Sequence, residues 1–240
     1  MNARQKKRTF LMLSTLLFAF IMLCSISSAG AAASVREQME KEATSLTSLQ
    51  SFYETHTKPY ERRYIIQYAP EYLVKFAVTE APAWIIKALD EALNGSYDPL
   101  VVSAIQCIGE LKIESFSDEL TDLFISAPQK SAAFATSFRM AVLDAMKNFN
   151  EESVNKKLHQ LIKSYSELLI CDPAFDKLME TVVLFGDESL VSELSRFEAH
   201  AQKRLETNKD DPERQREYAR ILQLISRTKH SVSAKGGKDE

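Results

Sequence analysis

Apolar positions along most of this chain recur at spacings of three and four residues, which is the pattern of one face of an α-helix. In the middle of the chain the pattern itself repeats. An Asp-Pro dipeptide at residue 98 returns at residue 172, two periods of about 37 residues later, and Ala104 is matched in helical phase by Ala141 and Leu178. No apolar run has the alternation of a strand between hairpin turns. The sequence therefore predicts an all-α chain built from a stacked array of helix pairs.

The punctuation of the array is typical of helix ends. Asp98, Asp172 and Asp211 each precede a proline. Aspartate accepts hydrogen bonds from the free amides of the first turn, and proline at the first helical position lacks only an amide proton that had no partner. We expect a helix to start at each of these sites, and we expect Gly186 to let the chain leave the preceding helix.

The segments that flank the array fit the period poorly. Residues 34–57 carry spaced apolar residues and predict one entry helix, Pro59 and Pro70 bracket a short helix, and Pro82 starts another. Terminal units of repeat arrays are commonly atypical. The predicted organisation is an atypical helical cap over residues 34–97, three repeats over 98–206, a C-terminal capping helix over 207–230 and a disordered tail over 231–240.

The first 33 residues have the composition of a secretory signal peptide. Four basic residues, an apolar run from Phe10 to Ile26 and an alanine-rich exit follow one another. Ala31 and Ala33 are both suitable cleavage positions, of which we favour Ala33. An uncleaved inner-membrane anchor is the alternative, and lipid modification of Cys24 is a third reading, which Leu23 disfavours because a small residue is expected there. The chain is therefore expected to be exported, to a periplasm or outside the cell.

Charge and cysteine content narrow the function classes. Residues 1–33 hold four of the 30 basic residues and none of the 33 acidic ones, so the remainder carries a net charge of −7. A nucleic-acid binder normally needs a basic face to neutralise phosphates, so no nucleic-acid partner is expected. Stacked helices lie about 10 Å apart, beyond the reach of a disulfide, so Cys107 and Cys171 are expected to be free thiols, with Cys107 buried.

Residues 98–124 resemble a HEAT repeat of the short bacterial type. The matching features are a proline-led first helix, a small-apolar core segment that ends in glycine, an acidic turn and a leucine-rich second helix. The residues that match are Pro99, Ala104, Ile105, Ile108, Gly109, Leu111, Leu120 and Leu123. The resemblance continues to residue 206, with Met146 in the place of the glycine in the second unit and Leu178 in the place of the alanine in the third. It implies a right-handed α-solenoid of antiparallel helix pairs whose second helices line a concave surface that holds protein partners.

Residues that could carry chemistry are few. The four histidines are far apart in sequence without metal-ligand spacing, and no Gly-rich phosphate loop or paired Cys-x-x-Cys motif is present, so neither a metal nor a cofactor is expected. The acidic cluster that opens one second helix is explained by the helix dipole. The second helix is acidic in the first unit, basic in the second and mixed in the third. This change of charge along the array predicts a partner-binding surface. Its residues are Asp118, Glu119, Asp122, Lys156, Lys157, His159 and Lys163.

We therefore expect an exported, non-catalytic HEAT-like scaffold or adaptor that binds a protein partner in a bacterial cell envelope. The alternative is a membrane-tethered structural or assembly factor of the envelope, with membrane contact only if the N-terminal segment is not cleaved. A lyase-like HEAT-repeat enzyme is a weaker third hypothesis. It is motivated only by a resemblance to bilin-attachment lyases.

Overall fold

The computed structural model describes residues 34–236, and they fall into two compact units that meet between Val78 and Thr79. Within the described range every element of regular secondary structure is helical, which confirms the all-α class. Residues 1–33, where the signal peptide is predicted, lie outside the described part of the chain. No helix between residues 34 and 236 is both long and apolar enough to cross a membrane.

The first unit holds a helix over residues 34–42, then α2 (Leu46–Thr55) and α3 (Pro59–Lys75). The prediction of a single entry helix was wrong, because the first helix ends at Glu42 and a second begins at Leu46. Ser45 and Ser48 form a capping box, in which each side chain accepts a hydrogen bond from the backbone amide of the other, and this arrangement starts a new helix.

Helix α3 also departs from the prediction, because it continues through Pro70 to Lys75. Proline inside a helix removes one backbone hydrogen bond and costs about 3 kcal/mol. Pro70 is buried together with Ala69, Tyr72 and Leu73. The apolar burial of this part of the helix offsets the cost that local sequence rules assign to proline.

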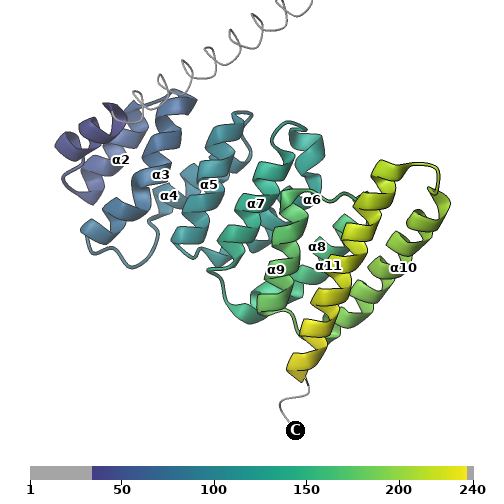
Figure 1. Cartoon of the computed structure of the whole chain (residues 1–240). Helices are drawn as coiled ribbons and strands as arrows, with labels where there is room; N and C mark the ends of the chain where they lie inside the picture. The colour runs from purple at the N-terminus through teal and green to yellow at the C-terminus, as the bar shows by residue number, and fades with distance from the viewer. Residues whose placement is uncertain (1–33, 237–240) are drawn as a thin grey trace, which may run out of the picture. The chain divides into compact units, whose positions relative to one another are not determined.

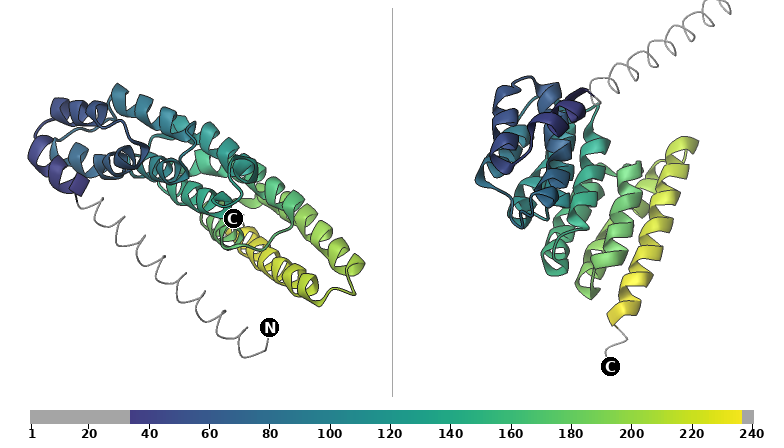
Figure 2. Two further views of the ribbon diagram at one scale, coloured as in Figure 1. Left: turned by 90° about the horizontal axis from the view of Figure 1, so that it is seen from above. Right: turned by 90° about the vertical axis from the view of Figure 1, so that its left-hand side faces the viewer.

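The second unit is an array of helices in two layers (Figures 1 and 2). The first-helix layer consists of α5 (Asp98–Glu110), α7 (Ala135–Met146), α9 (Pro173–Phe185) and α11 (Pro212–Gly236). The second-helix layer consists of α4 (Ala83–Leu93), α6 (Ser117–Lys130), α8 (Glu151–Leu168) and α10 (Val191–Thr207). Short 3-10 helices, η1 (Glu114–Phe116) and η2 (Glu188–Leu190), lead into α6 and α10.

Each layer is held by contacts between successive members, as α5–α7–α9–α11 and as α6–α8–α10. Between the layers, helices adjacent in sequence pack as α4–α5, α6–α7, α8–α9 and α10–α11. Helix α4 therefore belongs to the array, and the boundary of the unit lies after Val78 instead of after residue 97. The poor match of α4 to the sequence period concealed its position beside α5.

Helices α5 and α7 approach each other closely at a glycine. Gly109 of α5 faces Ala145 of α7, and a Cβ at Gly109 would lie 2.5 Å from the Ala145 Cα atom. Ala104, five residues earlier on α5, is fully buried. The small residues Gly109 and Ala145 let the two helices pack closely.

Two of the three Asp-Pro sites behave as expected. Asp172 accepts a hydrogen bond from the Phe175 amide at 2.9 Å, and Asp211 accepts from the amides of Glu213 and Arg214. Asp98 differs, because it is already helical and its carboxylate accepts instead from the Ser131 hydroxyl at 2.8 Å.

Helix α9 ends at Phe185 and the chain leaves it at Gly186, as predicted, but without a left-handed backbone. The backbone φ of Gly186 is −72°, which any residue can adopt. Its Cβ would lie 2.4 Å from the Val182 carbonyl oxygen and 2.8 Å from Leu190, so close contact requires the glycine. The left-handed conformation occurs instead at Lys112 and Leu169, after α5 and α8.

The C-terminal helix is longer than predicted. Helix α11 continues to Gly236, so residues 231–236, which were expected to be disordered, are helical. Val232 is fully buried and the Lys235 ammonium donates to the Leu184 carbonyl at 2.9 Å, so both residues attach the last turns to the array. Residues 237–240 lie outside the described range.

The cysteine prediction is confirmed. Cys107 is buried and Cys171 is half-buried, and both are free thiols. Burial raises the pKa of Cys107 far above its usual range, and burial also raises the pKa of Cys171. Both thiols are therefore weak nucleophiles at neutral pH.

Helix α7 carries a fully buried arginine that the sequence pattern did not single out. The Arg139 guanidinium lies over the rings of Phe124 and Tyr165, 5.7 and 5.1 Å from their centroids, and its Nε donates to the Phe124 carbonyl at 3.2 Å. Its Nη2 has no hydrogen-bond partner in the described residues. Arg139 thus links α6, α7 and α8 within the core.

Candidate functional site

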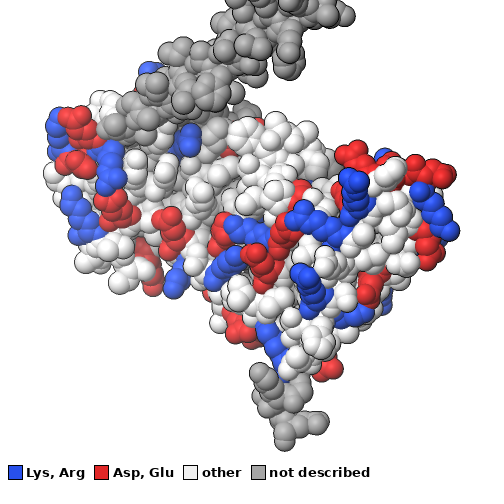
Figure 3. Space-filling view, viewed as in Figure 1, with Lys and Arg blue, Asp and Glu red and all other residues white. Residues whose placement is uncertain are grey.

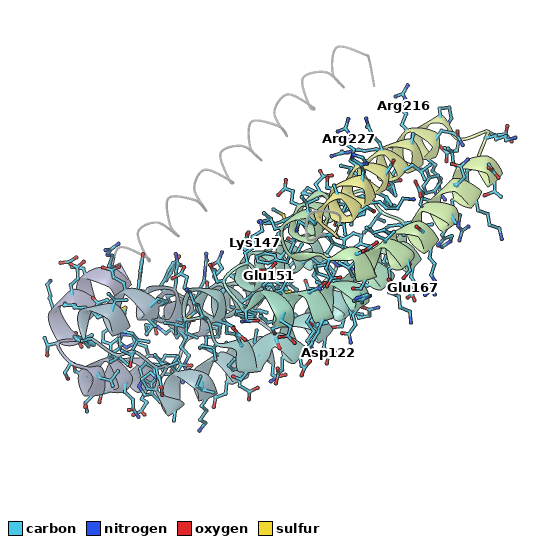
Figure 4. The ribbon with its side chains drawn as sticks, turned by 90° about the horizontal axis from the view of Figure 1, so that it is seen from below. Asp122, Lys147, Glu151, Glu167, Arg216 and Arg227 are labelled. Atoms are coloured by element: carbon cyan, nitrogen blue, oxygen red, sulfur yellow. The ribbon has the colours of Figure 1, made fainter. Side chains whose placement is uncertain are left out.

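The seven residues predicted to bind a partner lie on α6 and α8, which pack side by side in the second-helix layer, and α10 packs on the other side of α8. We call the exposed side of α4, α6, α8 and α10 the second-helix face. Figure 4 shows Asp122 of α6 on the opposite side of the unit from Arg216 and Arg227 of α11. The second-helix face therefore belongs to one layer only.

The acidic residues of α6 separate into two groups. Asp118 forms an ion pair with Lys157 of α8 and so joins the two helices. Glu119 and Asp122 instead line a groove of about 280 Å³ between α4 and α6, to which α4 contributes Asp90. Three carboxylates border this groove, so it favours a basic group of a ligand.

One lysine lies in the same groove. The Lys130 ammonium donates to the Leu93 carbonyl at the end of α4, at 2.6 Å. A cation beside the last carbonyls of a helix stabilises that helix end. The structural role of Lys130 leaves Glu119, Asp122 and Asp90 without an ion pair inside the described residues, and Asp90 accepts a hydrogen bond from Asn94.

The lysines of α8 also have different roles. Lys156 pairs with Glu152 one turn earlier at 2.7 Å, and Lys157 is engaged with Asp118. Lys163 alone among them lines a second groove, of about 380 Å³, between α8 and α10. The helix is not basic overall, because Glu151, Glu152 and Glu167 balance its three lysines.

The α8–α10 groove contains His159 at the centre of a polar network. Its Nδ1 lies 3.4 Å from the Glu193 carboxylate and its Nε2 lies 3.2 Å from the Ser189 hydroxyl. Ser192 donates to Glu193 at 2.6 Å, and this hydrogen bond, assisted by His159, lowers the pKa of Glu193. Arg196 completes the charged lining.

Ser189, His159 and Glu193 are arranged like the nucleophile, base and acid of a catalytic triad. Their hydrogen bonds, however, are those of a structural network. The Ser189 hydroxyl donates its proton to Asp187, so the serine oxygen is the acceptor in its hydrogen bond with His159 Nε2. The same hydrogen bonds lower the pKa of Asp187, with Ser189 as the main cause. Asp187 also accepts from Asn155. This network fixes the turn that leads into α10.

Sequence reasoning missed Ser189, Glu193, Arg196 and Asp90. His159 and Ser189 are 30 residues apart in sequence, and no local motif joins them. The repeat period was the available signal, because it aligns the start of each second helix with the next. Over residues 34–236 no group of three or more histidine, cysteine, aspartate or glutamate side chains could hold a metal ion.

The protein is thus an all-α array of helices whose second-helix layer carries two grooves lined by charged residues. No family model, curated protein or solved structure matches the chain.

Proposed function

We propose that this chain is an exported, non-catalytic scaffold or adaptor of the HEAT-like α-solenoid type, with right-handed superhelical stacking, that binds a protein partner on its second-helix face. The observation that carries the proposal is the pair of grooves on that face. The α4–α6 groove is bordered by Asp90, Glu119 and Asp122, and the α8–α10 groove holds Lys163 and Arg196 beside Glu167 and Glu193.

Such an arrangement suits an elongated protein segment with charges of both signs. A basic part of the partner would lie in the α4–α6 groove and an acidic part near Lys163 and Arg196. Complementary charges at two separate positions fix the orientation of a ligand more than they raise its affinity. The two-layer array supports the HEAT-like assignment, and the basic and apolar composition of residues 1–33 supports export.

The alternative, a membrane-tethered assembly factor of the envelope, differs only in the fate of residues 1–33. Mass spectrometry of the chain from envelope fractions separates the two, because a cleaved chain would begin near Ser34. A lyase-like enzyme remains the third hypothesis. An activity that is abolished by Ser189→Ala while partner binding persists would contradict the non-catalytic proposal.

Photocrosslinking in intact cells tests the proposed face. A photoreactive amino acid is placed at Gln160 or Ser126, both exposed on the second-helix face, and at Ser137, exposed on α7 in the other layer, as the control. We expect one dominant protein adduct from Gln160 and Ser126, reduced about tenfold by Asp122→Lys or Lys163→Glu. Equal adducts from Ser137, or adducts that neither charge reversal changes, would contradict the proposal.

A further inference from the structure

The first-helix layer has a preformed groove between its last two members, α9 and α11. The two helices lie side by side (Figure 2) and are fastened near both ends. Near the start of α9, the Arg220 guanidinium pairs with Asp176 at 2.5 Å, and at its end the Lys235 ammonium donates to the carbonyls of Leu184 and Gly186. These contacts require α9 and α11 to run in the same direction.

Between the fastened ends lies a groove of about 630 Å³ with an apolar lining. Its apolar residues include Val183 and Leu184 of α9 and Leu224 of α11, with the nearly buried Met179 at the bottom. Leu184 stands at the edge with 56% of its surface exposed, the second most exposed large apolar side chain in the described residues. A large apolar side chain exposed beside an apolar groove indicates a surface that is covered by a ligand.

The two walls of the groove carry opposite charges. Asp176 and Glu180 lie on the α9 wall, and Arg220 and Arg227 lie on the α11 wall. Because Asp176 and Arg220 pair with each other, Glu180 and Arg227 are left without an ion pair inside the part of the chain that the structure describes. Figure 3, which views this face, shows basic and acidic side chains interspersed with uncharged surface over α9 and α11.

We propose that this groove binds an amphipathic helix of a partner protein. The helix would present an apolar stripe to Val183, Leu184 and Leu224, an acidic flank to Arg227 and a basic flank to Glu180. Two parallel helices with residues lined up at spacings of three and four provide the geometry of helix-in-groove recognition. The groove residues of α9 run from Asp176 to Leu184, about 13 Å of helix, which accommodates about two and a half turns of a bound helix.

This site lies on the layer opposite to the second-helix face (Figure 4), so it is separate from the surface of the proposed function. An array with one groove system on each layer can hold two partners at once, which would suit an adaptor. The inference does not depend on the second-helix face, and Lys163→Glu, which changes that face, serves as the control here.

Binding of designed peptides to the full-length protein tests the proposal. The probe is a fluorescent helical peptide of about 15 residues with leucines at helical spacing, glutamates along one flank and lysines along the other. A second peptide has lysines on both flanks. Fluorescence anisotropy is measured with the native chain, with Leu184→Glu and Arg227→Glu, and with Lys163→Glu on the other layer as the matched control.

We expect saturable binding of the mixed-flank peptide, weakened about tenfold or more by Leu184→Glu and by Arg227→Glu and unchanged by Lys163→Glu. Arg227→Glu makes both walls acidic, so it is expected to strengthen binding of the all-lysine peptide. Leu184, Arg227 and Lys163 are all solvent-accessible, and circular dichroism checks that each variant is folded.

Absence of saturable binding, or binding that Leu184→Glu does not weaken, would overturn the proposal. So would a concentration-dependent dimer that Leu184→Glu abolishes in sedimentation equilibrium, because that result would assign the groove to a second copy of the chain.

Discussion

Asp172 shows at the residue scale how one side chain can join three helices. Its carboxylate accepts from the Phe175 amide at the start of α9, from the Tyr165 hydroxyl of α8 at 2.7 Å and from the Thr136 hydroxyl of α7 at 3.0 Å. Burial, with a smaller contribution from Asp172, raises the pKa of Tyr165 above its usual range, so this phenol remains a donor. Asp211 makes the same kind of cap for α11, but its partners are all local: the amides of Glu213 and Arg214 and the Arg214 guanidinium at 3.4 Å.

We therefore expect Asp172→Ala to lower the free energy of unfolding by about 2–4 kcal/mol, because it removes a helix cap and leaves the Tyr165 hydroxyl without its partner. Asp211→Ala, the matched control, removes a cap and an exposed ion pair with Arg214 but no contact to another helix, and is expected to cost about 1 kcal/mol. Urea denaturation followed by circular dichroism measures both. Equal losses would show that the hydrogen bonds to Tyr165 and Thr136 contribute nothing to stability.

At the element scale, α7 is positioned by its small residues on one side and by Arg139 on the other. Arg139 forms no ion pair with any residue that the structure describes. Its guanidinium contacts two aromatic rings and donates to one carbonyl. A buried charge without a carboxylate carries a desolvation cost, and replacement by an apolar side chain of similar length is often neutral or stabilising.

Arg139→Met is accordingly expected to leave the unfolding free energy unchanged or to raise it by up to about 2 kcal/mol. Arg139→Ala is expected to lower it by about 2 kcal/mol or more, because it leaves a cavity between α6, α7 and α8. Thermal and urea unfolding provide the comparison. A loss of more than about 1 kcal/mol in Arg139→Met would show that the guanidinium stabilises the core through its aromatic and carbonyl contacts.

For the whole molecule, the position of α4 decides where the array begins. Residues 79–240 form one compact unit that includes α4, whereas the sequence period placed the start at residue 98. Leu89 of α4 is fully buried and Ile85 nearly so, and α4 packs against α5. Without α4, the first helix of the regular repeats would expose its apolar face.

A chain of residues 79–240 is therefore expected to unfold cooperatively. A chain of residues 98–240 should be less stable by about 3 kcal/mol or more, since each buried aliphatic side chain contributes about 1.5–3 kcal/mol. Circular dichroism during urea unfolding, with m-values compared, tests both. Equal stability of the two chains would show that the array begins at residue 98, as the sequence period predicted.

Sequence alone determined the helical class, the repeat and most helix starts, because periodicity, Asp-Pro caps and capping residues act within a few neighbouring residues. It misjudged Pro70 and the end of α11, where the burial of the helix outweighs local preference. Tertiary structure decided which charged side chains form ion pairs and which line grooves. Lys157 pairs with Asp118, whereas Lys163 and Arg227 line grooves. The reason is physical, because a groove exists only between helices that the sequence separates by tens of residues.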